Sequence, residues 1–278
     1  MFIIGKRQEL TAVKTVDFGI YLAEEGDREN RVLLPKKEVP EDLKLGDKLE
    51  VFLYKDSQDR LIATRRKTKV SVGELAVLNV GSITKIGAFL DWGLEKDLLL
   101  PFKEMTATLH EGDEVLVTAY EDKSGRLCAT MKVYKFLHTD SDYQKDDWVQ
   151  ARVYELSDRF GAFVAVDDKY SALIPKKEVT KDIRVGDKFE ARVTGVHEDG
   201  KLNLSTREKS YMTIDKDAEY VMYLINSYDG VLPFNDKATP ETIKRECNMS
   251  KNQFKRAVGH LLKNGDIEIG EKVIYARK

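Results

Sequence analysis

The sequence predicts a mainly β protein with a C-terminal α+β unit: three consecutive five-stranded barrels followed by a small domain that contains helices. A six-residue phrase occurs three times, as Leu34–Val39, Leu100–Met105 and Ile174–Val179. The dipeptide Gly-Asp follows the proline of each phrase by eleven positions. After about Lys209, the alternating pattern of the repeats gives way to helical spacing of the apolar residues. An internal repeat of this kind indicates consecutive copies of one folding unit.

Each repeat is expected to contribute five short strands. In the third repeat, Val153–Leu156 and Phe163–Val166 have the composition of strands, and the alternating stretch Phe189–Val193 follows the Gly-Asp. The polar turn Glu198–Gly200 then leads into the closing strand Leu202–Ser205. Five short strands favour a small closed barrel, because closure leaves few unpaired strand edges.

These patterns divide the chain into four domains. The barrels are expected at residues 1–68, 69–140 and 146–209, and the C-terminal domain at 211–278. The formal net charge of −2 conceals an uneven distribution, because residues 71–147 carry 8 basic and 14 acidic side chains. The other three segments are close to neutral. Attraction to phosphate groups must therefore come from local clusters of basic residues rather than from the whole protein.

The third repeat resembles the S1 domain, a barrel of the OB-fold class that binds RNA. The resemblance is carried by Phe160–Val164, the turn Val185–Asp187 and the closing strand Leu202–Ser205, which occur in the order and spacing of that family. The second repeat matches well, and the first is degenerate. The resemblance implies that two exposed aromatic rings on each intact barrel stack on unpaired bases. Stacking of this kind contributes about 1–3 kcal/mol for each base.

By this resemblance, Phe160 and Phe163 are the two base-stacking rings of the third repeat. A phenylalanine in a strand is usually a core residue, but the glycine between these two and the family pattern favour binding. Phe18 and Tyr21 match both positions in the first repeat. In the second repeat, Ile86 replaces one ring.

The polar positions of the third repeat differ from the S1 pattern. Pro175, His197 and Asn203 occupy positions where S1 domains usually carry a histidine, an aspartate and an arginine. We therefore expect general single-strand binding rather than sequence-selective hydrogen bonding. The further RNA-binding candidates on this repeat are Tyr154, Lys176, Lys177, Arg192, His197 and Asn203.

The C-terminal domain resembles a winged helix-turn-helix. A first helix is expected from near Asp215, a second after the cap Thr239, and a third after the capping box of Ser250 and Gln253. The third helix should end at Gly265 and be followed by two strands. Its expected buried stripe is Phe254, Val258, Leu261 and Leu262. The opposite arc includes the nucleic-acid-binding candidates Asn252, Lys255, Arg256 and Lys263.

The sequence gives no indication of catalysis, a cofactor or a metal site. The four histidines are scattered, and the two cysteines, Cys128 and Cys247, lie far apart. No glycine-rich phosphate loop and no apolar run long enough to span a membrane is present. We therefore expect a cytoplasmic protein that is not an enzyme and does not bind membranes.

Three S1-like barrels followed by a winged helix resemble the conserved virulence factor B family, also called YitL-like proteins. The resemblance implies an RNA-binding regulator of virulence-factor and other gene expression in Gram-positive bacteria. We expect the third barrel to bind single-stranded RNA with help from the winged helix. Two alternatives stay open: the winged helix binds duplex DNA and regulates transcription, or the protein is a scaffold whose acidic second barrel binds a protein partner.

Overall fold

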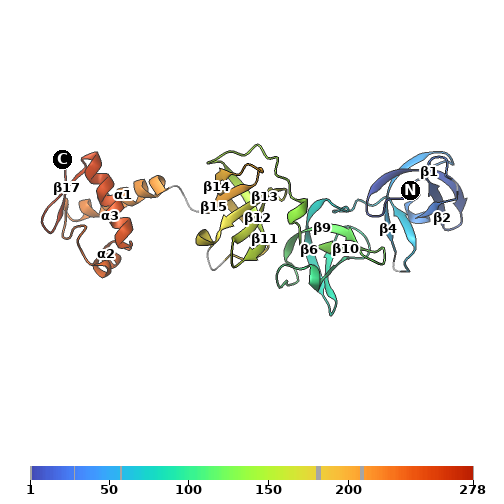
Figure 1. Ribbon diagram of the computed structural model, residues 1–278, viewed down its shortest axis with the longest axis horizontal. Helices are drawn as coiled ribbons and strands as arrows, with labels where there is room; N and C mark the ends of the chain where they lie inside the picture. The colour runs from blue at the N-terminus through green and yellow to red at the C-terminus, as the bar shows by residue number, and fades with distance from the viewer. Residues whose placement is uncertain (1, 28, 57, 180–182, 207–209, 278) are drawn as a thin grey trace. The chain divides into compact units, whose positions relative to one another are not determined.

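The computed structural model describes residues 2–27, 29–56, 58–179, 183–206 and 210–277. It forms two compact units, Met1–Thr206 and Arg207–Lys278. The first unit is built from strands, and the second contains the helices α1, α2 and α3 (Figure 1). The predicted fold class is confirmed, with five-stranded barrels in the first unit and helices with a small sheet in the second.

The first and third barrels are closed and share one strand order, in which the first strand pairs with the second and the fourth. The first barrel consists of β1 (Arg7–Val16), β2 (Gly19–Ala23), β3 (Arg31–Pro35), β4 (Lys48–Lys55) and β5 (Leu61–Thr64). The third consists of β11 (Trp148–Ser157), β12 (Gly161–Val166), β13 (Tyr170–Pro175), β14 (Lys188–Val196) and β15 (Leu202–Ser205).

The second barrel has the same connections, but the two strands at the ends of its sheet, β8 and β10, lie against each other without ladder hydrogen bonds. Its strands are β6 (Leu75–Ile83), β7 (Gly87–Asp91), β8 (Leu98–Pro101), β9 (Glu114–Glu121) and β10 (Leu127–Thr130). The barrel is therefore nearly closed, which leaves the S1-like arrangement of strands unchanged.

The repeated phrase of the sequence forms the end of a strand and a short 3-10 helix. These helices are η1 (Lys36–Glu38), η2 (Phe102–Glu104) and η4 (Lys176–Glu178). In the first barrel, Glu38 accepts a 2.6 Å hydrogen bond from the Thr64 hydroxyl at the end of the closing strand. In the second barrel, Glu104 accepts a 2.8 Å bond from Thr130 in the same way. In the first two barrels, the glutamate of the phrase thus holds the last strand, which links the two recurring patterns.

The glycine of the aromatic motif is required by the backbone. Gly161 has φ +124°, and a Cβ atom built on it would lie 2.1 Å from the carbonyl oxygen of Ile174. Only glycine tolerates both the positive φ and this close approach of the neighbouring strand. Gly161 therefore fixes the point at which β12 begins, directly after Phe160.

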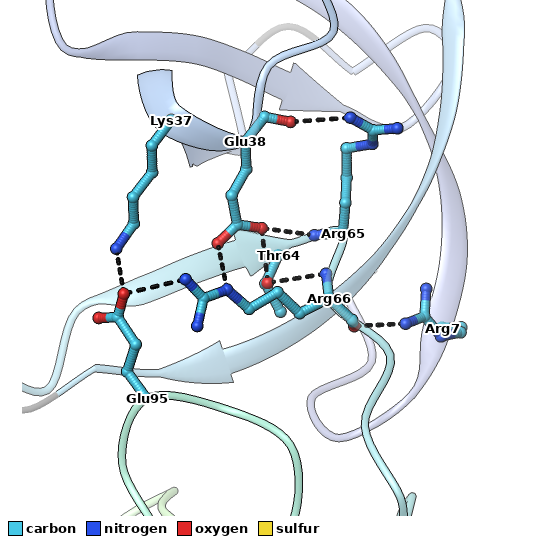
Figure 2. A network of polar contacts seen from close by, with 7 residues as sticks. All are labelled: Arg7, Lys37, Glu38, Thr64, Arg65, Arg66 and Glu95. Atoms are coloured by element: carbon cyan, nitrogen blue, oxygen red, sulfur yellow. Dashed lines mark hydrogen bonds and ion pairs between the residues drawn. The ribbon is translucent and has the colours of Figure 1, made fainter.

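Polar and aromatic contacts join the first and second barrels. The rings of Phe52 and Trp92 lie 5.9 Å apart, edge to face, in a shared apolar cluster. Glu95 of the second barrel accepts hydrogen bonds from Lys37 and Arg66 of the first, and Arg66 also pairs with Glu38 (Figure 2). Shared burial and these ion pairs hold the two barrels together.

A second apolar cluster joins the second and third barrels. It contains Leu116 of β9, Tyr154 of β11 and Ala165 of β12, with Val133 and Leu137 from the connecting segment. The 3-10 helix η3 (Tyr134–Phe136) lies in this segment between the buried residues Val133 and Leu137. The connection is thus packed against both barrels, which fixes the position of η3 next to the third barrel.

The second unit has three helices and a small sheet among its described residues. The elements are α1 (Ser210–Ser227), β16 (Val231–Leu232), α2 (Pro240–Cys247), α3 (Lys251–Asn264), β17 (Ile267–Ile269) and β18 (Ile274–Ala276). The predicted caps are confirmed at Thr239 and Ser250, and α3 ends at Gly265 with φ +83°. Helix α1 begins five residues before the expected Asp215, and β16 is too short to leave an alternating pattern in the sequence.

Candidate nucleic-acid interface

The register of the third barrel aligns three side chains on its outer face. Phe163 of β12 pairs with Leu173 of β13, and Leu173 pairs with Asn203 of β15. Their neighbours Ala162, Val164 and Ile174 are buried in the barrel core. Because successive side chains of a strand point to opposite faces, the row from Phe163 to Asn203 faces outward.

Phe160 lies immediately before β12 and extends the same surface. Its side chain is 51% exposed, and its ring centroid lies 6.2 Å from that of Phe163 with an interplanar angle of 61°. The backbone N–H of Lys176 donates a 2.9 Å hydrogen bond to the carbonyl of Phe160. The guanidinium of Arg159 lies 5.2 Å from the Phe160 ring. The exposed ring of Phe160 and the partly buried ring of Phe163 form a platform at the surface, with a cation beside it.

A groove of about 250 Å³ lies next to Phe163 on the same face. Leu173 and Leu202 contribute apolar surface, and Asn203 lies at the end of the row. The other polar residues of the groove are Ser171, His197, Asp199 and Lys201. Two candidates from the sequence, His197 and Asn203, are therefore brought together beside the phenyl platform.

Lys176 and Lys177 are exposed on η4. The hydrogen bond between the Lys176 backbone and Phe160 places this short helix next to the platform. Arg159, which the sequence analysis did not single out, lies on the platform itself. Its only signal in the sequence is its place directly before the aromatic motif.

The structure corrects the expectation for Tyr154. Its side chain is 1% exposed, and its ring lies behind Phe163 with a centroid separation of 6.3 Å. Burial raises the pKa of Tyr154, and its backbone carbonyl accepts a 2.6 Å hydrogen bond from Thr106 of the second barrel. A ring in this position supports the platform and has no surface on which a base can stack.

Arg192 is also unsuited to the phosphate contact expected from the sequence. Its side chain is 12% exposed, and its Nη1 atom lies 2.8 Å from the carboxylate of Asp146. The ion pair holds the guanidinium against the barrel at the start of β11. The sequence identified Arg192 as a basic residue of the repeat but gave no information about its acidic partner.

The aromatic positions of the other two barrels have different surroundings. Phe18 is 57% exposed, and its ring lies 6.5 Å from that of the partly exposed Tyr21. In the second barrel, Ile86 and Phe89 line a groove of about 560 Å³ that also includes Glu38 and Glu95. The first barrel therefore has a platform of its own, whereas the face of the second is a groove shared with its neighbour.

Helix α3 presents its four candidate residues to solvent. Asn252, Lys255, Arg256 and Lys263 are all exposed. Gln253, by contrast, accepts a 3.0 Å hydrogen bond from the Ser250 backbone as part of the capping box. The expected buried stripe was wrong in one residue, because Leu262 is 46% exposed and Ala257 is buried. The turn of the helix places Ala257, rather than Leu262, between the other buried side chains.

Models of known domains match most of the chain. The model of the S1 domain matches residues 4–66 and 72–132. The model of the second domain of the virulence regulatory factor CvfB matches residues 131–208, and that of the CvfB-like winged helix domain matches residues 219–275. The S1 model thus matches the first two barrels. The third barrel, which has the aromatic motif intact, is matched by the model of the CvfB second domain.

The protein YitL of Bacillus subtilis is 32% identical to this chain, over 99% of this chain and 94% of that protein. The chain belongs to the conserved virulence factor B family. Proteins named conserved virulence factor B from Staphylococcus saprophyticus and Staphylococcus aureus are each 31% identical to it. These matches cover 82% and 90% of this chain, and 79% and 86% of the relatives. The predicted family membership is therefore confirmed.

A crystal structure from Streptococcus pneumoniae has the same fold. It is described as a multidomain protein with nucleic acid binding domains, and it is 24% identical to this chain, with a TM-score of 0.53. The match covers 99% of this chain and 98% of that one. In the part of the present chain that the structure describes, no helix is both long and apolar enough to cross a membrane.

Proposed function

We propose that the protein binds single-stranded RNA on the outer face of the third barrel. The platform of Phe160 and Phe163 carries this proposal, because base stacking requires aromatic rings held rigidly at the surface, and here Phe160 is 51% exposed while Phe163 is partly exposed on β12. Bases in a duplex already stack on one another, so such a platform favours unpaired bases. The matches to S1-domain models support the same class of ligand.

The surroundings of the platform support contact with a nucleic acid backbone. Arg159 and the exposed Lys176 lie next to Phe160, where they can attract phosphates. Helix α3 supplies exposed Lys255 and Arg256 on the second unit. Two weak sites on one chain gain apparent affinity when they contact the same RNA. The proposal assigns the protein a binding activity rather than a catalytic one.

The biological role that we propose follows from the family. Several relatives are named conserved virulence factor B, and one matching model is that of a virulence regulatory factor. We infer that this chain acts in the cytoplasm, where its binding to transcripts changes gene expression after transcription. Virulence factors are the class of gene product that the family name indicates.

Fluorescence anisotropy with a single-stranded oligouridine tests the proposal. The double variant Phe160→Ala, Phe163→Ala should bind about 2–4 kcal/mol more weakly than the native protein if both rings stack. Phe102→Ala is the matched control, because Phe102 is 53% exposed on η2 of the second barrel and lies outside the platform. Unchanged affinity of the double variant would reject the platform as the RNA site.

The exposed basic face of α3 favours a second candidate, binding to duplex DNA through the winged helix. Competition between duplex DNA and oligouridine for the full chain separates the two functions. If RNA is the ligand, duplex DNA should compete poorly, and Lys255→Ala with Arg256→Ala should weaken RNA binding. Tight duplex binding that is lost in this variant and kept in the platform variant would favour a DNA-binding regulator.

A further inference from the structure

We infer that Tyr134 is a third aromatic ring of the RNA site and closes a pocket for one unpaired nucleobase on the third barrel. The inference rests on the proposed function and extends it to a residue outside the repeated motif. Tyr134 lies on η3, in the segment that connects the second and third barrels. The match to the CvfB second-domain model begins at residue 131, so this segment belongs with the third barrel in the family.

The position of the ring supports this role. Tyr134 is 49% exposed, and its ring centroid lies 6.2 Å from that of Phe163, with an interplanar angle of 77°. The Phe163 ring therefore has two aromatic neighbours, Phe160 and Tyr134, each with a centroid separation of 6.2 Å. Tyr134 and Phe163 both line the groove of about 250 Å³, so the two rings form adjacent walls of the groove.

The segment that carries Tyr134 is held in place by its neighbours. Val133 and Leu137 are buried in the cluster between the barrels. The backbone of His138 pairs with β13: its N–H donates to Lys169, and its carbonyl accepts from Ser171 at 2.8 Å. A large aromatic ring is therefore kept half exposed on an anchored segment. Such an arrangement lowers the entropy cost of binding, because the ring is already in position.

The charge of the groove favours a base over a phosphate. The ammonium of Lys201 lies 2.6 Å from the carboxylate of Asp199 and 5.6 Å from the Tyr134 ring. This pairing offsets the positive charge inside the groove. The exposed basic residues Arg159 and Lys176 lie beside Phe160 instead. The backbone of the RNA is thus directed past Phe160, while the groove is left for a neutral ring.

Asn203 gives the pocket a polar edge. Among the described residues, none hydrogen-bonds its side-chain amide, which lies in register with Leu173 and Phe163. An amide offers both a donor and an acceptor, so it can pair with the edge of a base that stacks on one of the rings. The two rings stand at 77° to each other, so a base that stacks on one meets the other with its edge, and Leu173 adds apolar surface beside them.

Oligouridine binding by Tyr134→Ala in the full chain tests the inference. We expect affinity to fall about 5- to 150-fold, the effect of losing one stacked base. Tyr134→Phe should bind within about threefold of the native protein, because the ring is kept. Phe136→Ala is the matched control, since Phe136 is in the same short helix and does not line the groove.

The outcomes separate the inference from the proposed function. Native affinity of Tyr134→Ala, together with weak binding of the Phe160→Ala, Phe163→Ala variant, would overturn the inference and leave the platform standing. Native affinity of both would overturn the two together. Photocrosslinking of the native protein to oligo-5-bromouridine tests the same contact without any substitution. A crosslink at Tyr134 is expected, and crosslinks confined to the peptide of Phe160 and Phe163 would contradict it.

Discussion

The hydroxyl of Thr106 in the second barrel donates a 2.6 Å hydrogen bond to the backbone carbonyl of Tyr154 in the third. The Tyr154 ring in turn lies directly behind Phe163. The outer face of the third barrel is thus supported by contacts that cross to its neighbour. The acidic second barrel, in which Ile86 replaces one stacking ring, thus supports the candidate site of its neighbour.

A buried arginine at the same junction should contribute to stability. Arg152 of the third barrel has a side chain that is 6% exposed, and it pairs with Asp168 at 2.7 Å and Glu114 of the second barrel at 3.3 Å. Arg152→Ala should lower the free energy of unfolding by about 2–4 kcal/mol, because it leaves Asp168 without its buried cation. Urea denaturation followed by circular dichroism measures the change.

Glu114→Gln is the control for that experiment. Glu114 is 58% exposed, so solvent screens its interaction with Arg152. The substitution should cost less than about 1 kcal/mol. Equal losses in the two variants would show that the pair between the barrels, rather than the buried cation itself, supplies the stability.

Replacement of Gly161 should be severe for a reason visible in the backbone. Gly161→Ala has to place a methyl group 2.1 Å from the Ile174 oxygen at φ +124°. We expect a loss of at least about 2 kcal/mol of unfolding free energy. Gly195→Ala is the matched control in the same barrel, because no atom lies within 4 Å of the added Cβ. Thermal unfolding that is lowered equally by both would contradict this account.

The salt dependence of RNA binding should distinguish two basic residues that the sequence placed in one set. Lys176 is exposed beside Phe160, whereas Arg192 is held by Asp146. Lys176→Ala should lower the slope of log affinity against log salt concentration by about 0.7, the contribution of one phosphate contact on a single strand. Arg192→Ala should leave that slope unchanged and lower stability instead. Titrations of oligouridine at several salt concentrations give both slopes.

Alkaline pH should destabilise the protein through a buried thiol. Burial, followed by the nearby Asp122 carboxylate, raises the pKa of Cys128 to about 11 from its ordinary value of 9.0. The unfolded chain releases this proton near pH 9 and the folded chain only near pH 11. The thiol's contribution is therefore complete below pH 9 and is lost as pH rises to 11, by up to about 2–3 kcal/mol.

Cys128→Ala removes this titration and provides the comparison. The difference in unfolding free energy between the native protein and the variant should shrink from pH 9 to pH 11. Two parallel stability curves over that interval would contradict the assignment. Slow alkylation of the folded protein at pH 8, with rapid alkylation in urea, is the expected accompanying result, because only the thiolate reacts.

Much of the fold could be predicted because it depends on local patterns that repeat. Glu38 of the repeated phrase hydrogen-bonds with Thr64 at the end of the closing strand, so these two patterns are linked in the fold as well as in the sequence. The capping box of Ser250 and Gln253 is likewise a local signal, and it correctly located the start of α3. The resemblance to S1 domains predicted that Phe163 lies on the outer face of its barrel, and its register with Leu173 and Asn203 agrees with that position.

The errors and omissions concern contacts between elements that are distant in the sequence. Tyr154 has the pattern of a strand residue, and nothing in the repeat shows that Leu116 and Val133 bury it. Arg192 is a candidate for a phosphate contact on the basis of the sequence, but the structure places Asp146 beside it. Tyr134 follows the last strand of one repeat and precedes the next, so no motif marked it. Side-chain environments of this kind depend on how neighbouring barrels pack.

Part of the segment that connects the second and third barrels is buried, and this limits how the protein can be cut into fragments for study. A fragment that starts at Trp148 would retain every strand of the third barrel, β11 to β15. It would nevertheless expose the apolar surfaces of Tyr154 and Ala165, which Val133 and Leu137 cover in the intact chain. It would also lack one wall of the groove. Binding constants measured on such a fragment would therefore describe a damaged surface rather than the native one.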